Sequence, residues 1–350
     1  MRETISRAPC RIDLAGGTID LTPLFYYLHP HEVQHFAIDL YAKCKITSRP
    51  AQSTSLNIYS REYQTNKKFS SLKRLKNSLN NKKNQLSWPC RIADYFFEKY
   101  KIKKQEVNIE LASDIPPGSG LGGSSVLGVA IYSALEKHFF PKTRSNKWAT
   151  QSILRNLESQ ELGFPAGEQD YVPALFGGLL SFHLGMEKFS VSKFSNKSKD
   201  ELNKRICLIY TGKPHHSGLN NWQVYRDFHE GNQKVRNSLE KLSSISTELK
   251  NSLSSHQWKK FGKILNKEWE HRQKLSSKID AAVFRKIKKD LKQFPHSALK
   301  GCGAGGGGCA LIYFANPNDQ EKFCQNWQIP KDHQLIKPRI VTQGVQTRSR

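Results

Sequence analysis

Residues 116–125, PPGSGLGGSS, form a glycine-rich segment whose composition suits the binding of an anion. Glycines at 118, 120, 122 and 123 let backbone N–H groups approach a ligand closely and allow left-handed backbone angles. Ser124 and Ser125 can cap a helix that starts here, and a helix N-terminus attracts negative charge. The segment therefore predicts an anion site, and a phosphate chain is the ligand that suits it best.

Two other phosphate motifs fit this segment poorly. The spacing Gly118-x-Gly120-x-x-Gly123 matches the dinucleotide fingerprint, but the preceding strand alternates in polarity and no acid follows about 20 residues later. A Walker A loop needs lysine followed by serine or threonine, whereas Gly123 runs directly into Ser124. A glycine turn that only packs against a neighbouring element remains the alternative when the segment is taken alone.

Carboxylates accompany two further turns. Asp13 and Asp20 lie on either side of the glycine turn at 15–18, and Arg11 shares a face with Asp13 if the strand is extended. Such a turn can hold a polyol, although an ordinary hairpin capped by Asp20 is the alternative. Asp170 lies among turn residues in GFPAGEQDYVPA and precedes an apolar, glycine-containing hairpin, which suits a catalytic carboxylate in a cleft.

A second glycine-rich loop occurs near the C-terminus. Six glycines fall within Gly301–Gly308, and the apolar run CALIYF follows at once. A flexible linker would not normally lead straight into a buried strand, so the pattern favours a structured loop that brings backbone close to a ligand.

The elements that position these residues follow from hydrophobic periodicity. Strands are predicted at 5–14, 33–48, 107–113 and 205–210, and helices at 88–100, 124–134, 148–162 and over much of 220–292. Residues 190–204 are polar and charged and mark a domain boundary. Residues 60–85 are basic and polar, which indicates a surface excursion.

Composition sets the protein class. The 350 residues, 37% of them hydrophobic, suffice for two domains with a sizeable core. Seven scattered cysteines without CxxC spacing indicate reduced thiols and no zinc site. Since no stretch has 18 apolar residues and no secretory leader is evident, we expect a cytoplasmic protein without membrane partners.

The net charge of +25 raises the possibility of nucleic-acid binding. The basic residues, however, concentrate in 61–83 and 234–300, on stretches that read as helical or loop surface. Solvated faces explain such runs better, so nucleic acid is not an expected partner. A basic surface would still help to attract phosphorylated substrates.

Arg7–Asp20, Pro116–Ser125 and Gly301–Cys309 together resemble the three motifs of the GHMP kinase superfamily of galacto-, homoserine, mevalonate and phosphomevalonate kinases. RAPCRIDLAGGTIDL and GFPAGEQDYVPALFGG are most similar to sugar kinases of the heptose 7-phosphate and fucokinase type. The resemblance implies an α+β protein of two domains. Residues 1–195 would resemble ribosomal protein S5 domain 2, and residues 205–350 would be ferredoxin-like, with ATP in the cleft between them.

The resemblance also assigns roles to single residues. Asp170 would be the catalytic base and Arg11 the cation beside the transferred phosphoryl group, while Ser124 and Glu158 would bind Mg²⁺. The nucleotide phosphates would be wrapped by Pro117, Gly118, Ser119, Gly120, Leu121, Gly122, Gly123, Ser124 and Ser125. The acceptor would be bound by Gly17, Thr18, Asp20, Gly303, Ala304, Gly305 and Gly306.

The expected function is therefore an ATP-dependent kinase for a hydroxyl of a sugar or sugar phosphate. A mevalonate- or galactose-type kinase and a catalytically silent binding protein are the alternatives, and the oligomeric state stays open. The chain departs from the family pattern at three places: GLGGSS replaces GLGSSA, GGTID replaces GGGTD, and Tyr171 replaces a common glutamine.

Overall fold

The computed structural model describes residues 2–29, 31–80, 84–213, 217–279, 282–303 and 305–350. An eight-stranded sheet forms the larger part, in the order β12-β1-β2-β5-β3-β4, with β6 paired to β2 and β7 paired to β6. Its strands are β1 (Arg2–Ala15), β2 (Glu32–Pro50), β3 (Ser55–Ser60), β4 (Thr65–Phe69), β5 (Gln105–Ser113), β6 (Leu179–Leu184), β7 (Phe189–Lys193) and β12 (Gln346–Ser349). A 3₁₀ turn at Leu24–Tyr26 lies between β1 and β2.

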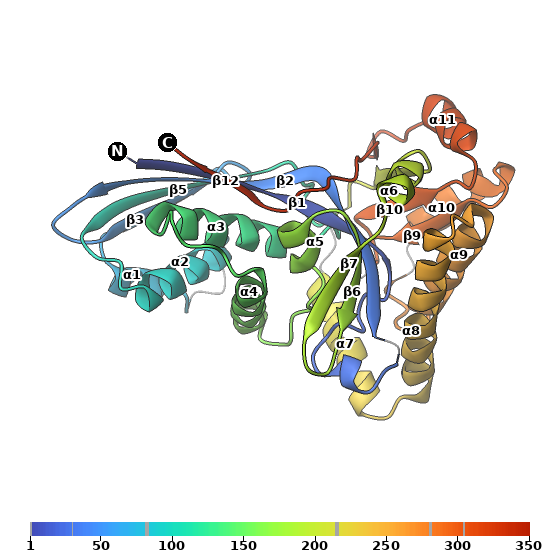
Figure 1. Ribbon diagram of the computed structural model, residues 1–350, viewed down its shortest axis with the longest axis horizontal. Helices are drawn as coiled ribbons and strands as arrows, with labels where there is room; N and C mark the ends of the chain where they lie inside the picture. Colours follow the sequence, from blue (N-terminus) through green and yellow to red (C-terminus); the bar gives the residue numbers. More distant parts are fainter. Residues whose placement is uncertain (1, 30, 81–83, 214–216, 280–281, 304) are drawn as a thin grey trace.

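Helices cover one face of this sheet (Figure 1). They are α1 (Leu72–Ser78), α2 (Ser87–Lys99), α3 (Gly123–Phe139), α4 (Lys147–Leu162) and α5 (Tyr171–Phe176). Helix α3 lies against β1 and β2 and is apolar on most sides, with Val126, Val129 and Ile131 all buried. An all-round apolar helix is stable only inside a protein, so the end of the glycine-rich segment is fixed by the core.

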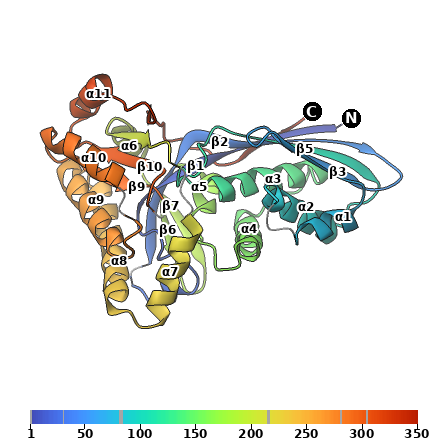
Figure 2. The same cartoon turned by 180° about the vertical axis from the view of Figure 1, so that it is seen from behind.

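The second part contains a four-stranded antiparallel sheet in the order β11-β8-β10-β9. Its strands are β8 (Ile206–Tyr210), β9 (Ala298–Gly301), β10 (Cys309–Tyr313) and β11 (Gln334–Ile336). The helices of this part are α6 (Asn196–Asn203), α7 (Ser217–His229), α8 (Gln233–Ser254), α9 (Trp258–Gln273), α10 (Ala282–Asp290) and α11 (Pro317–Asn326), with a 3₁₀ turn at Leu291–Gln293. Figure 2 shows α8 and α9 side by side along one edge of the molecule.

The end of the chain returns to the first sheet. Strand β12 pairs antiparallel with β1, from Thr4 opposite Ser349 to Arg7 opposite Gln346, so the two termini lie together (Figures 1 and 2). The predicted second domain, 205–350, thus gives its last residues to the sheet of the first. The predicted surface excursion contains β4 and α1.

Candidate active site

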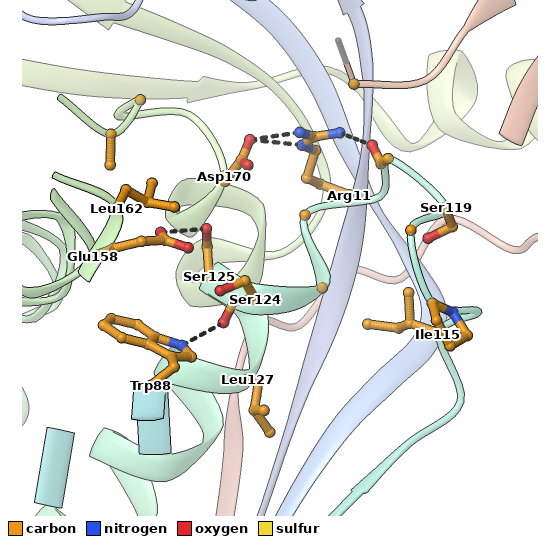
Figure 3. Close-up of a pocket in the computed structure, with 18 of the residues that line it drawn as sticks. Arg11, Trp88, Ile115, Ser119, Ser124, Ser125, Leu127, Glu158, Leu162 and Asp170 are labelled. Atoms are coloured by element: carbon orange, nitrogen blue, oxygen red, sulfur yellow. Dashed lines mark hydrogen bonds and ion pairs between the residues drawn. The ribbon is translucent and has the colours of Figure 1, made fainter. Parts of the chain in front are cut away.

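A cavity of about 730 Å³ lies where the two parts meet. Its wall contains residues of β1, of the 115–125 segment, of α4 and of the 164–170 turn, and the second part adds Asn221, Arg272 and Gly303. Figure 3 shows Arg11, Asp170, Glu158 and the two serines of α3 around this space. Segments far apart in the sequence therefore form one site.

The glycine-rich segment makes one wall of the cavity. Gly118, Gly120 and Gly122 have φ of 62°, 76° and 77°, a region that glycine adopts without penalty. Trp88 Nε1 donates to the carbonyl of Ser124 at 2.9 Å and ties the start of α3 to α2. All the predicted phosphate-loop residues border the cavity except Leu121, whose side chain is buried in the hydrophobic core.

Arg11 and Asp170 form an ion pair at the centre of the site. Arg11 donates from Nε at 2.9 Å and from Nη2 at 2.7 Å to Asp170 Oδ1, and from Nη1 at 2.7 Å to the carbonyl of Gly120. Asp170 is at the N-cap position of α5, yet its side chain does not cap that helix. The pair joins β1, the glycine-rich segment and α5.

Glu158 and Ser124 lie on the neighbouring wall (Figure 3). Ser125 Oγ donates to Glu158 Oε2 at 2.7 Å, and the Tyr171 hydroxyl donates to the same oxygen. Burial raises the pKa of Glu158, and hydrogen bonds from Tyr171, Ser125 and Ser124 oppose that effect.

Carboxylate and hydroxyl oxygens suit Mg²⁺, so Ser124 and Glu158 fit a metal role. The described residues contain no cluster of three or more His, Cys, Asp or Glu side chains able to hold a metal alone. A magnesium ion at this wall would therefore take its other ligands from nucleotide phosphates and water, as is usual for this ion.

The turn at residues 15–20 (the acceptor turn, after its predicted role) also borders the cavity, through Thr18 and Asp20. Asp20 accepts a hydrogen bond from the backbone N–H of Gln169 at 2.9 Å, and burial raises the pKa of Asp20 to about 7. Thr18 borders the cavity at φ 74°, whereas Gly17 lies behind it, where an added Cβ would be 2.5 Å from Asp13 Oδ2.

Among the described residues of the second glycine loop, Gly303 is the predicted position that reaches the cavity. Gly303 borders it, but Gly305 and Gly306 turn towards Ile279, whose carbonyl accepts from Gly306 N at 2.8 Å. Gly305 and Gly306 therefore shape the loop and do not line the cavity. Ala304 lies outside the described residues.

Residues 88–178 match the family described as GHMP kinases N terminal domain. This range holds the glycine-rich segment, Glu158 and Asp170. The chain thus carries the N-terminal domain of the GHMP kinases. As a GHMP kinase it is an ATP-dependent phosphotransferase that acts on a hydroxyl group.

Relatives of this GHMP kinase include sugar and sugar-phosphate kinases. It is 23% identical to D-glycero-alpha-D-manno-heptose 7-phosphate kinase of Campylobacter jejuni over 325 residues, 91% of each chain. It is 24% identical to glucuronokinase 1 of Arabidopsis thaliana over 53% of this chain and 52% of the relative. The shared length with the first relative includes both parts of the molecule.

Solved structures share the fold. A D-glycero-D-manno-heptose 1-phosphate kinase from Bacteriodes thetaiotaomicron superposes with a TM-score of 0.74 at 21% identity, covering 99% of this chain and 98% of that one. Mevalonate kinase of Methanococcus jannaschii gives a TM-score of 0.74 at 18% identity over 96% and 98%. The GHMP kinase fold is thus confirmed. No helix in the described ranges is long and apolar enough to cross a membrane.

This kinase contains a buried charge cluster that sequence patterns hardly indicate. Lys300 Nζ lies 3.0 Å from Asp13 Oδ2 and 2.8 Å from Glu268 Oε1, and Arg272 Nη2 lies 2.5 Å from the same Glu268 oxygen. Arg272 also donates to the carbonyl of Gly17 and to Thr18 Oγ1, at 3.1 and 3.2 Å. The only sequence signals are a lysine inside an apolar strand and an acid and a base four residues apart on a helix.

Proposed function

We propose that this GHMP kinase transfers the γ-phosphoryl group of ATP to a hydroxyl of a sugar or sugar phosphate, with a heptose 7-phosphate-like compound as the first candidate. The Arg11–Asp170 pair carries the proposal, because it lies between the glycine-rich wall and the acceptor turn. A donor phosphate on the first and a hydroxyl on the second would meet at this pair.

Asp170 would accept the proton of the acceptor hydroxyl. Both Arg11 bonds end on Oδ1, so Oδ2 is the oxygen available to the acceptor. As the hydroxyl oxygen bonds to the γ-phosphorus, the bond to the ADP oxygen breaks and the proton moves to Asp170. Arg11, held in place by Gly120 and Asp170, would stabilise the charge that develops on the transferred group.

The nucleotide phosphates would lie along residues 117–125, excluding Leu121, with N–H groups from the start of α3 directed at them. Magnesium held by Ser124 and Glu158 would neutralise phosphate charge when bound. The cavity continues past Trp88, Ile115 and Leu127, whose apolar surfaces suit the nucleoside.

The acceptor would lie against Thr18, Asp20 and Gly303. Asp20 and the Gln169 amide are both buried beside this end of the cavity, and polar groups at a dry surface recognise hydroxyls selectively. Similarity to the heptose 7-phosphate kinase over most of both chains supports a sugar phosphate, and similarity to glucuronokinase supports a sugar without one. The catalytically silent alternative lacks support, because Arg11, Ser124, Glu158 and Asp170 are all present at the cavity.

A panel of acceptors with ATP and Mg²⁺ tests the proposal. ADP release would be measured with heptose 7-phosphate, fucose, galactose, glucuronate, mevalonate and homoserine, with Asp170→Asn as the control for contaminating kinases. We expect kcat/KM for the best sugar or sugar phosphate to exceed that for mevalonate and homoserine by about 10² or more, because hydroxyl-reading sites discriminate strongly. Mevalonate or homoserine as the best acceptor would refute the sugar assignment.

A further inference from the structure

Two hydroxyl groups converge on a single oxygen of Glu158. Ser125 Oγ donates to Oε2 at 2.7 Å, and Tyr171 Oη donates to the same atom from the opposite helix. Glu158 comes from α4, Ser125 from the first turn of α3, and Tyr171 is the first residue of α5. The carboxylate is therefore the point at which three helices are linked.

This arrangement distinguishes the two oxygens of Glu158. Oε2 accepts both of these bonds, which leaves Oε1 to act together with the Ser124 hydroxyl, the third hydrogen-bond partner of this carboxylate. Glu158, Ser124 and Ser125 border the cavity, but Tyr171 is fully buried and does not. Tyr171 can thus affect a ligand in the cavity through its neighbours that border it, namely Glu158, Ser125 and Asp170.

We propose that Tyr171, together with Ser125, is a positioning residue for the metal-binding carboxylate of Glu158. The two hydrogen bonds would fix the rotation of the carboxylate, so that Glu158 and Ser124 could hold a divalent cation between them. Partners of this kind orient metal ligands, and their loss commonly weakens metal binding about 10–100-fold. The inference rests on the proposed metal role of Glu158.

The position of Tyr171 also connects Glu158, the proposed metal ligand, with Asp170, the proposed base. Its ring is packed in the core cluster below α3, and it directly follows Asp170. A tyrosine fixed by its ring and by its hydroxyl therefore holds Asp170 and Glu158 in one constant relation. A phenylalanine would keep the ring packing and lose only the bond to Glu158, which makes Tyr171→Phe a clean test.

The experiment measures metal affinity apart from turnover. Mn²⁺ would be titrated by electron paramagnetic resonance into the parent and Tyr171→Phe proteins saturated with a non-hydrolysable ATP analogue. We expect about tenfold weaker Mn²⁺ binding in the variant, with affinity for the metal-free analogue within about twofold of the parent. The Mg²⁺ concentration for half-maximal turnover should rise in parallel, while the acceptor KM stays nearly constant.

Tyr132→Phe is the matched control. Tyr132 is also buried in the first part of the molecule, its hydroxyl lies 3.3 Å from that of Tyr100, and it does not border the cavity. Its loss should leave Mn²⁺ binding unchanged. Ser125→Ala removes the other bond to Oε2 and should weaken Mn²⁺ binding in the same direction as Tyr171→Phe.

Unchanged Mn²⁺ affinity in Tyr171→Phe would overturn the proposal. If that variant does not fold, Ser125→Ala decides the matter, because normal metal affinity without the serine hydroxyl is incompatible with the proposed positioning. Failure of every acceptor in the panel would count against the proposed reaction but would leave the Mn²⁺ titration readable, so the two failures are distinguishable.

Discussion

Arg11 places two of its N–H groups on one oxygen of Asp170 and a third on the carbonyl of Gly120. The guanidinium is almost fully buried, whereas the Asp170 side chain keeps 27% of its surface exposed to the cavity. A fixed cation and a partly open carboxylate are what phosphoryl transfer to a hydroxyl requires, since the protein mainly positions the reactants and stabilises charge.

Asp170→Asn should nearly abolish phosphoryl transfer. The amide keeps the shape of the side chain but cannot take a proton, and general-base catalysis contributes about 10²–10⁴-fold. We expect kcat to fall by about that factor while the affinity for an ATP analogue stays within a few-fold, measured by single-turnover kinetics and calorimetry. Turnover within about tenfold of the parent would remove Asp170 from the role of base.

Asp20 should make stability depend on pH. Burial raises its pKa to about 7, whereas an unfolded aspartate titrates near 4, so the native state holds the proton more tightly. The contribution of Asp20 to the free energy of unfolding is then fully present below about pH 4. It is lost as pH rises to about 7, at about 1.4 kcal/mol per pH unit.

Asp20→Asn, which is neutral at every pH, should remove this dependence. The difference in free energy of unfolding between the parent and the variant would be measured by urea denaturation at pH 5, 6, 7 and 8. We expect the free energy of unfolding of the parent to fall relative to that of the variant from pH 5 to 7. Above pH 7 the difference should become constant. A difference that is constant across this range would show that Asp20 is ionised throughout.

The resemblance to the GHMP kinases could place Arg11, Ser124, Glu158 and Asp170 at one site, because the motifs that carry the resemblance are local in the sequence. It could not pair Tyr171 with Glu158. The two residues meet only after α4, a turn and α5 are folded against α3, and no period in the sequence encodes that contact. The prediction that Leu121 borders the cavity is wrong for a similar reason. The sequence does not show which side chains of an irregular loop turn into the core.

At the scale of elements, the two glycine-rich loops support each other. Cys309 N donates to the carbonyl of Ser119 at 2.8 Å. A Cβ on Gly120 would collide with the carbonyl oxygen of Cys302, and one on Gly303 would be 2.9 Å from Gly120 Cα. Because the loops touch through backbone, the second glycine loop acts mainly as a support for the phosphate wall and only partly as a wall of its own.

Gly120→Ala should therefore disturb both stability and nucleotide binding. The residue has φ 76°, which costs a non-glycine residue about 1–2 kcal/mol, and the new methyl group would also displace residues 302–303. We expect affinity for an ATP analogue to fall at least about tenfold, measured by calorimetry, together with a lower melting temperature.

Gly163→Ala separates the two causes. Gly163 has φ 78° at the end of α4, but nothing lies within 4 Å of its Cβ position. This variant should lose stability through backbone strain alone and keep its affinity for the ATP analogue. Equal losses of nucleotide affinity in both variants would contradict the role of the contact between the loops in nucleotide binding.

Hydrophobic periodicity was sufficient for the long strands and for α2, α3 and α4, which each bury an apolar face. It failed for β12, whose residues QTRS carry no apolar pattern and pair with a strand more than 300 residues away. It also missed β4 and α1, because their exposed, basic sequence resembles a loop. Partners supplied by tertiary structure, and not local preference, decide such elements.

At the scale of the whole molecule, the buried charge cluster joins the two parts. Asp13 belongs to β1 of the large sheet, Lys300 to β9 of the small sheet, and Glu268 and Arg272 to α9. All four side chains are at most 2% exposed, and their charges sum to zero. Arg272 extends the cluster to Gly17 and Thr18, so the joint between the parts also holds the acceptor turn.

Length, the polar join and the motif order predict two parts. They do not predict the joint between them, because this chain has 55 basic and 30 acidic residues and most charged side chains are exposed. Only the fold reveals which few are buried. A buried ion cluster also adds less stability than its contacts suggest, since desolvation offsets the attraction, but its disruption is costly.

Lys300→Met should destabilise the kinase strongly, because it leaves the carboxylates of Asp13 and Glu268 with Arg272 as their remaining partner in the cluster. Breaking a buried pair costs about 3–5 kcal/mol, and we expect a loss of that order by urea denaturation. Lys300→Met combined with Glu268→Gln restores neutrality and keeps an acceptor for Arg272, so the double variant should recover part of the loss. In the double variant the KM for the acceptor should still rise more than the KM for ATP, because the contacts of Arg272 with Gly17 and Thr18 are weakened.

Lys267→Met is the matched control, on the helix that carries Glu268 and Arg272. Lys267 pairs with Glu248 at 3.4 Å, but the side chains are 49% and 46% exposed, so this pair contributes at most about 1 kcal/mol. If Lys300→Met were no more damaging than Lys267→Met, or if the double variant were less stable than the single one, the cluster would not be the joint between the two parts. If acceptor and ATP KM rose equally, the cluster would serve the fold without holding the acceptor turn.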